Sequence, residues 1–89
     1  MLELQYGNHF KKELNLALQR PGHTLDKLKM VLNYLVREES LPAQYNDHKL
    51  KGDYKNCREC HILPDWLLIY RIKEGCVTLI RTGSHSDLF

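Results

Sequence analysis

The sequence predicts a compact α+β fold (β-α-α-β-β-β), in which a helical hairpin packs on one face of a small, mostly antiparallel sheet. Apolar residues recur every three or four positions through most of the first 40 residues, which is the period of a helix. Short apolar or alternating segments separated by Gly or Pro follow after residue 53, which favours strands and tight turns. A chain of 89 residues is long enough for one domain, which we place at residues 1–89.

The first 22 residues predict a strand followed by a helix. Apolar and polar residues alternate over residues 2–6, which favours a short half-buried strand that Gly7 ends. Asn8 is placed to cap the helix that follows. The apolar face of this helix comprises Phe10, Leu14, Ala17 and Leu18. We expect the helix to end at Arg20–Gly22, which includes a proline.

A second helix is predicted to begin after Thr24, a favoured N-cap residue. Its apolar stripe comprises Leu25, Leu28, Leu32 and Leu35. Because the turn between the two helices is short, we expect them to be antiparallel neighbours.

The helical period stops after Ser40. Residues 41–52 have no sustained period and predict a loop that crosses the molecule. Strands are then predicted at residues 54–62, 65–72 and 75–82, and the breaks between them are short enough for hairpins. Ser84 can cap one helical turn in the C-terminal tail. The helices should cover one face of the sheet and leave the other free for function.

Charge and hydropathy limit the classes of function. Thirteen Lys and Arg against eleven Asp and Glu give a net charge of +2, which permits a nucleic-acid partner without indicating one. The N-terminus lacks the layout of a signal peptide. The longest apolar run, Trp66–Tyr70, is far too short to span a membrane. We therefore expect a soluble, cytoplasmic protein with no membrane partner and with reduced cysteines.

Residues 57–61 (Cys-Arg-Glu-Cys-His) match the C-x-x-C-H pattern of haem, zinc and redox sites. In a strand, however, residues i and i+3 point to opposite faces, so Cys57 and Cys60 could not bind the same atom. Cys76 is the one other thiol of the chain. We interpret the two cysteines as small strand residues and predict neither a metal site nor a cofactor.

The histidines of the second half suggest a site. His48, His61 and His85 lie near predicted strand ends or loops, together with Asp65 and Arg81. The alternative is that these histidines are scattered over the surface. RNA can be cut by its own 2′-hydroxyl when a base removes the hydroxyl proton, an acid protonates the departing 5′-oxygen and a cation stabilises the phosphorus centre. Histidine suits both proton transfers, and arginine suits the phosphate.

Strand alternation leaves the placement of Arg81 open. In the strand 75–82, Arg81 shares a face with Val77 and Leu79. If that face is the core, Arg81 must lie where the strand leaves the core or after a bulge. Trp66 or Phe89 could stack on a base, and Lys49 and Lys51 could line the approach of the RNA backbone.

Residues 45–52, 58–70 and 81–89 together closely resemble the YafQ branch of RelE-like toxins in content, order and spacing. The resemblance implies a compact microbial RNase fold and the toxin of a type II toxin–antitoxin pair. It further implies an mRNA interferase that cuts mRNA on the translating 70S ribosome without a metal. The implied partners are a cognate antitoxin that silences the toxin and, for the toxin–antitoxin complex, operator DNA.

Carried over by position, the resemblance places the family's site on His48, His61, Asp65, Arg81, His85 and Phe89. We predict His85 as the general acid and Arg81 as the phosphate clamp, and we leave the base open between His48 and His61. Asp65 would orient a histidine or bond the nucleotide. Trp66 stays open between base stacking and core packing, and Lys49 and Lys51 are predicted to bind substrate.

Two alternatives from other classes remain open. One is a non-catalytic protein of the same fold that binds an antitoxin, the ribosome or operator DNA. The other is a metal or haem protein built on Cys57, Cys60 and His61.

Overall fold

A five-stranded sheet with the strand order β1-β5-β4-β3-β2 forms the centre of the molecule. The computed structural model describes residues 1–89. The strands are β1 (Glu3–Tyr6), β2 (His48–Lys49), β3 (Arg58–Leu63), β4 (Trp66–Lys73) and β5 (Cys76–Gly83). β1 runs parallel to β5, and all other neighbours are antiparallel, which confirms the predicted mostly antiparallel sheet.

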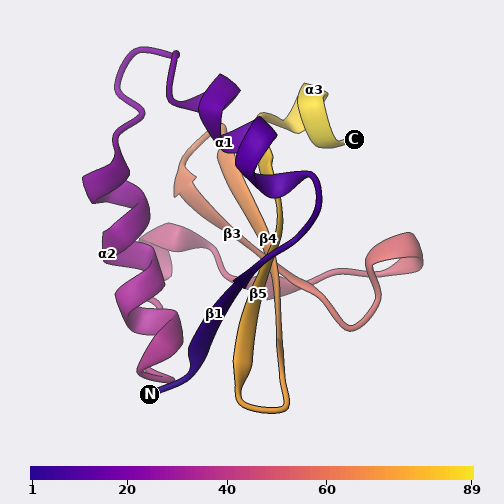
Figure 1. Ribbon diagram of the computed structural model, residues 1–89. Helices are drawn as coiled ribbons and strands as arrows, with labels where there is room; N and C mark the ends of the chain where they lie inside the picture. Colours follow the sequence, from indigo (N-terminus) through magenta and orange to yellow (C-terminus); the bar gives the residue numbers. More distant parts are fainter.

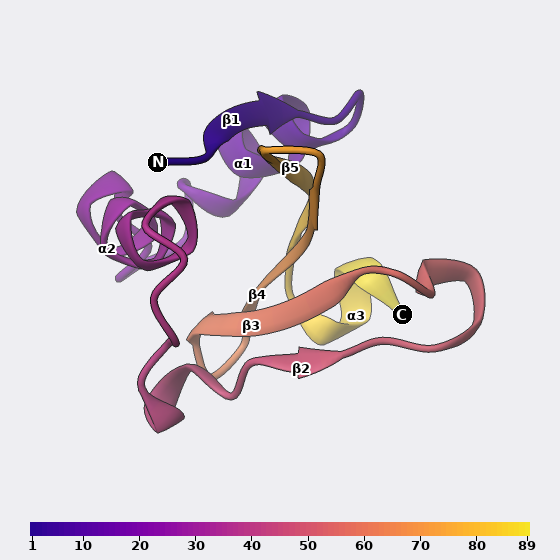
Figure 2. The same ribbon diagram turned by 90° about the horizontal axis from the view of Figure 1, so that it is seen from below.

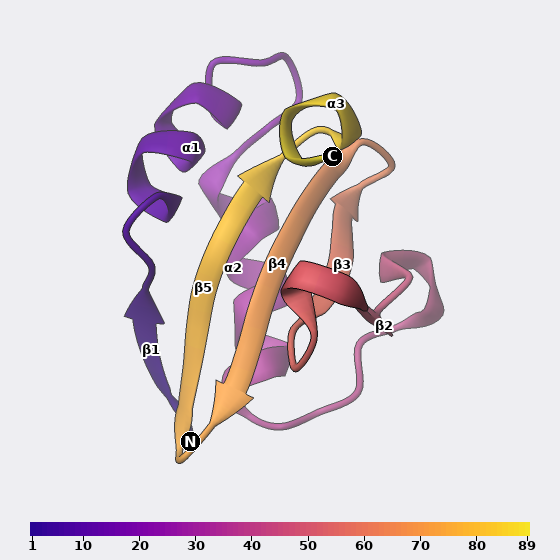
Figure 3. The ribbon, with the colours of Figure 1, turned by 90° about the vertical axis from the view of Figure 1, so that its right-hand side faces the viewer.

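Two helices cover one face of the sheet and a short helix lies on the other. The helices are α1 (Phe10–Ala17), α2 (Leu25–Val36) and α3 (His85–Leu88). In Figure 1 the chain runs up through α1 and returns down through α2, and Figures 2 and 3 show both on the face opposite α3. The predicted α+β class with its helical hairpin is confirmed. None of these helices is long and apolar enough to span a membrane.

Two of the three predicted helix caps are confirmed. The Thr24 side chain accepts a hydrogen bond from Lys27 N, and Ser84 forms a capping box with Asp87. The prediction for Asn8 is wrong, because α1 begins after His9 and has no side-chain cap. A backbone turn takes the place of the cap there, since Phe10 N donates to the carbonyl of Gly7.

β4 is buried on both faces because it is the central strand. Trp66, Leu68 and Tyr70 pack into the main core with Phe10, Val31 and other residues of α1 and α2. Leu67 and Ile69 face the other way and pack with Cys57 and Leu88 in a second, smaller core. This double burial explains why the strand has a continuous apolar run rather than alternation.

A β-bulge in β5 settles the orientation of Arg81. Ile69 pairs with Arg81 whereas the next residue, Tyr70, pairs with Leu79, so Ile80 is the extra residue. Paired residues share a face, so Leu79 faces the main core and Arg81 faces the opposite side. The bulge is one of the two solutions that alternation had left open.

The segment between α2 and β3 differs most from the prediction. The predicted loop 41–52 contains the 3₁₀ turn η1 (Ala43–Tyr45) and the two-residue strand β2. The predicted strand 54–62 begins four residues late, at Arg58, because a second 3₁₀ turn, η2 (Gly52–Tyr54), precedes it. In α2, Leu28, Val31 and Leu35 are the buried positions, whereas Leu25 is exposed.

Candidate active site

The predicted catalytic residues of the strands gather on the sheet face away from α1 and α2. Strand pairing aligns one row across four strands, namely Arg81, Ile69, Glu59 and His48. His61, paired with Leu67, lies in the next row on the same side. We call the surface formed by His48, Glu59, His61 and Arg81 the open face. The helix α3, which follows the end of β5, borders the open face (Figure 3).

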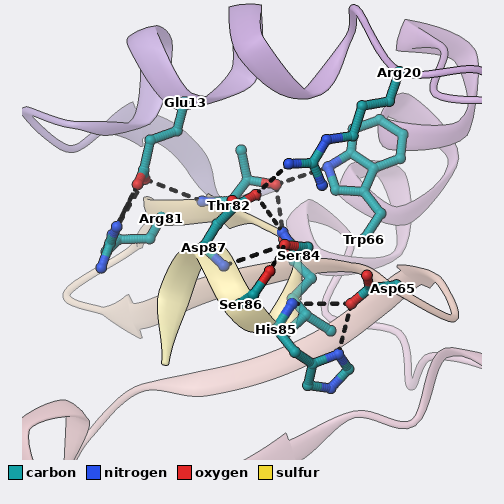
Figure 4. Close-up of polar contacts among 11 residues, drawn as sticks. Glu13, Arg20, Asp65, Trp66, Arg81, Thr82, Ser84, His85, Ser86 and Asp87 are labelled. Carbon is teal, nitrogen blue, oxygen red and sulfur yellow. Dashed lines mark hydrogen bonds and ion pairs between the residues drawn. The ribbon is translucent and has the colours of Figure 1, made fainter.

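Asp65 holds His85 at the first turn of α3. The Asp65 carboxylate accepts a hydrogen bond from His85 N (2.9 Å) and lies 2.7 Å from the ring Nδ1, as Figure 4 shows. These bonds, the backbone one foremost, hold the pKa of Asp65 below its usual value. An ionised carboxylate accepts hydrogen bonds and does not donate them, so Nδ1 carries the proton in this pair. Nε2 is then the ring atom left for chemistry.

The three predicted histidines form a chain. The ring centroids of His85 and His61 are 5.6 Å apart, edge to face, and those of His61 and His48 are 6.2 Å apart. His48 Nδ1 lies 2.8 Å from the carbonyl of Asn46, which fixes the proton on Nδ1. The sequence prediction that His48, His61, Asp65 and His85 come together is therefore matched by their placement.

Glu59 lies between two of these histidines. One carboxylate oxygen, Oε1, is 3.4 Å from Nε2 of His48 and 3.6 Å from Nε2 of His61. The side chain is only 6% exposed, and its other oxygen has no hydrogen-bond partner. Glu59 was not among the predicted site residues, although its spacing of two from His61 in a strand indicates that both share a face.

Arg81 also has partners that the sequence did not indicate. Its Nε and Nη2 donate to the Glu13 carboxylate of α1, and its Nη1 donates to the hydroxyl of Tyr54 (3.2 Å). These hydrogen bonds, those to Glu13 foremost, raise the pKa of Arg81 above its usual value. Tyr54 in turn meets the exposed Phe89 ring edge to face at 6.2 Å. No sequence pattern indicates that α1 lies beside β5, so the contact of Glu13 with Arg81 could not be predicted from the sequence.

The C-terminal helix is tied to the segment that follows α1 as well as to the sheet. Arg20 Nη2 lies 2.8 Å from the Asp87 carboxylate, which also accepts from Ser84 N (Figure 4). His85 is thus positioned from two sides, by Asp65 and by the anchored helix.

Trp66 belongs to the core. The side chain is fully buried, its Nε1 donates to Thr82 Oγ1 (2.8 Å), and the His23 ring stacks on it at 4.3 Å with an interplanar angle of 4°. Of the two roles left open for Trp66, the burial supports core packing, because no face of the indole ring is free to stack on a base. Trp66 is therefore corrected from a substrate-binding residue to a packing residue.

Lys49 and Lys51 lie at the outer edge of the sheet. Both are exposed, and Lys49 pairs with Arg58 rather than with a residue of the open face. The structure does not bring them into contact with the histidine chain.

The C-x-x-C-H segment does not form a ligand set. Cys57 packs in the second core and Cys60 in the main core, on opposite faces of β3. Burial raises the pKa of the Cys60 thiol above its usual range. No group of three or more His, Cys, Asp or Glu side chains is arranged to hold a metal ion.

Comparisons with known proteins show the family of the chain. The model of a family described as the bacterial toxin of type II toxin-antitoxin system, YafQ, matches residues 2–89. The chain is 36% identical to the mRNA interferase toxin YafQ of Escherichia coli (strain K12) over 98% of this chain and 95% of that protein.

Solved structures share the fold over the whole chain. A metal-bound toxin from Helicobacter pylori is 44% identical, with a TM-score of 0.90 and full coverage of both chains. A chain of the E. coli DinJ-YafQ complex is 34% identical, with a TM-score of 0.87, covering 100% of this chain and 99% of that one. The chain belongs to the YafQ family of bacterial toxins of type II toxin–antitoxin systems.

Proposed function

We propose that this protein, as one domain of residues 1–89, is an endoribonuclease that cuts mRNA with its own side chains as acid, base and clamp. The E. coli relative is named an mRNA interferase toxin. The observation that carries the proposal is the Asp65–His85 pair, with its distance of 2.7 Å to Nδ1. It leaves Nε2 as the one ring atom of His85 that is free to exchange a proton with substrate.

His85 acts as the general acid. In its protonated form it donates the Nε2 proton to the 5′-oxygen of the leaving nucleotide. The ionised Asp65 stabilises this imidazolium and fixes the ring orientation, as the carboxylate of a catalytic triad does for its histidine.

Arg81 binds the scissile phosphate. Its position in the row is two strands from Glu59, a spacing of about 10 Å at ~4.8 Å per strand. A phosphodiester between Arg81 and the histidine chain would have the guanidinium on one side and the histidines that serve as acid and base on the other. The guanidinium stays charged throughout the reaction and stabilises the charge that develops on the phosphate oxygens.

His61 is the better candidate for the base, because its ring is the neighbour of His85. It takes the proton of the 2′-hydroxyl, whose oxygen then attacks phosphorus. The bond from phosphorus to the 5′-oxygen breaks, and that oxygen receives the proton of His85, leaving a 2′,3′-cyclic phosphate. Glu59 stabilises the proton on His61 from its buried position, with His48 as the further member of the chain.

Exposed groups around this centre would hold the RNA. Phe89 presents a ring that is 66% exposed for stacking on a base, beside Tyr54. Lys49 and Lys51, at the sheet edge, would contact backbone phosphates farther along the strand. We propose mRNA on the 70S ribosome as the substrate and the cytoplasm as the place of action.

The partner that controls the toxin is proposed to be a cognate antitoxin. The E. coli relative has been solved in a DinJ-YafQ toxin-antitoxin complex, and this chain has the same fold over its whole length. We extend the proposal to binding of operator DNA by the toxin–antitoxin complex. The competing proposal is a non-catalytic protein of this fold that binds the same partners.

Mapping of mRNA 5′ ends after controlled expression tests the function. We expect cuts inside reading frames with the native chain and a loss of at least about 100-fold with His85→Ala, the scale for removing a general acid. His9→Ala is the matched control, because His9 is an exposed histidine that is not a member of the chain of His48, His61 and His85. Identical 5′-end maps for the native chain and His85→Ala would overturn the proposal in favour of the non-catalytic alternative.

A further inference from the structure

The guanidinium of Arg81 is already paired in the free protein. Oε2 of Glu13 accepts from its Nη2 and Nε, and Oε1 lies 3.3 Å from both Nε and the backbone N of Thr82. Glu13 lies 68 residues away in sequence and reaches the site from α1 (Figure 4). The two side chains are 27% and 17% exposed, so solvent screens the pair only in part.

The pairing leaves Arg81 able to bind a phosphate. A guanidinium has five N–H donors, of which Glu13 takes those on the Nε and Nη2 side and the Tyr54 hydroxyl takes one on Nη1. One N–H group on each of Nη1 and Nη2 is then left for phosphate oxygens. Glu13 therefore orients the clamp without blocking it.

Glu13 also changes the long-range electrostatic attraction between Arg81 and RNA. A phosphodiester that approaches Arg81 is attracted by the guanidinium and repelled by the carboxylate beside it, and the two charges cancel at longer range. The nearby acid thus removes most of the long-range attraction for RNA while keeping the short-range hydrogen bonds.

We infer that Glu13 is a specificity-determining residue that keeps the affinity of the free toxin for single-stranded RNA low. This inference rests on the proposed role of Arg81 as the phosphate clamp. RNA that is presented by a larger assembly gains its affinity from other contacts and needs only the hydrogen bonds of Arg81. RNA in solution depends on charge attraction, which Glu13 cancels.

Neutralising Glu13 tests the inference. The probe is a short single-stranded RNA in which 2′-deoxy residues prevent cleavage, and its Kd is measured without ribosomes over a series of salt concentrations. We expect Glu13→Gln to bind about threefold to fivefold more tightly at low salt, the size of a partly exposed charge interaction. The slope of log K against log salt should steepen by about 0.7, the value for one added phosphate contact on a single strand.

Three variants complete the design. Glu3→Gln makes the same change of charge on β1, next to the β4–β5 turn, and should alter Kd less than twofold. Glu13→Asp keeps the charge and should bind as the native chain does. The double variant Glu13→Gln/Arg81→Ala has neither charge and lacks the hydrogen bonds of Arg81, so the gain should vanish and it should bind no more tightly than the native chain.

The outcomes separate the inference from the function on which it rests. If Arg81→Ala binds the probe as tightly as the native chain, the clamp role of Arg81 is wrong. If Arg81→Ala weakens binding but Glu13→Gln does not tighten it, the clamp stands and the role of Glu13 is wrong. Should Glu13→Gln fail to fold, Glu13→Ala carries the same expectation, and an unchanged Kd for that variant overturns the inference equally.

Discussion

Replacing Thr82 with valine should destabilise the protein by disrupting a buried hydrogen-bond chain. The Thr82 hydroxyl accepts from Trp66 Nε1 at 2.8 Å and donates to the carbonyl of Leu67 at 2.7 Å, and both side chains are at most 1% exposed. Valine has the same shape but no hydroxyl, so the indole N–H and the carbonyl lose their partner in the core. An unsatisfied buried group costs about 1–3 kcal/mol, and we expect the free energy of unfolding to fall by that amount.

Urea unfolding of four proteins measures this cost: the native chain, Thr82→Val, Trp66→Phe and the double variant. Phenylalanine has no N–H to leave unpaired, so Thr82→Val should cost at least about 0.5 kcal/mol less in the Trp66→Phe background. The melting temperature of Thr82→Val should fall by roughly 4–8 °C for each kcal/mol lost. A change in unfolding free energy within about 0.5 kcal/mol for Thr82→Val, with no coupling to Trp66→Phe, would refute the reasoning that places Trp66 in the core.

Four further predictions concern the site and its surroundings. Asp65→Asn should lower kcat about 10- to 100-fold with little change in KM, because the charge that stabilises the His85 imidazolium is lost; single-turnover cleavage measures this, and an unchanged kcat would contradict it. His61→Gln should lower kcat at least as strongly as His48→Gln, and the reverse order would make His48 the base. Toxin freed of metal by chelator dialysis should cut at the native rate, and restoration by added zinc or copper would contradict side-chain catalysis. Burial lowers the pKa of His23, so the unfolded chain binds more protons just below pH 6.5 and stability should rise with pH there; His23→Phe, which can still stack on Trp66, should flatten that rise in urea unfolding from pH 5 to 7.

The central part of the fold was predictable because its signals are local. The run from Trp66 to Tyr70 and its flanking turns set β4 within one residue, and Thr24 and Ser84 marked the helix starts. The two-residue strand β2 had no such signal, because it is defined by its pairing with Glu59 and Arg58 and not by a pattern in its own two residues. Asn8 failed as a cap because a backbone bond to Gly7 provides an equivalent start.

The orientation of Arg81 depends on a β-bulge, which residue types alone do not predict. With regular alternation, Arg81 would face the main core beside Leu79. The extra residue Ile80 turns Arg81 to the open face, in line with Glu59. A bulge is a property of the pairing between two strands. The alternation within one strand can indicate that a bulge is required, but it does not show at which residue the bulge lies.

Each positively charged or proton-carrying group of the proposed site has a carboxylate beside it. Asp65 lies against His85, Glu59 against His61, and Glu13 against Arg81. These acids explain why a protein proposed to act on RNA has a net charge of only +2, since its cationic groups are matched locally. A site of this kind has oriented hydrogen bonds but little long-range attraction for a polyanion. Its substrate must then be delivered by contacts elsewhere, and this is the physical reason to expect that mRNA held on a ribosome is cut in preference to free RNA.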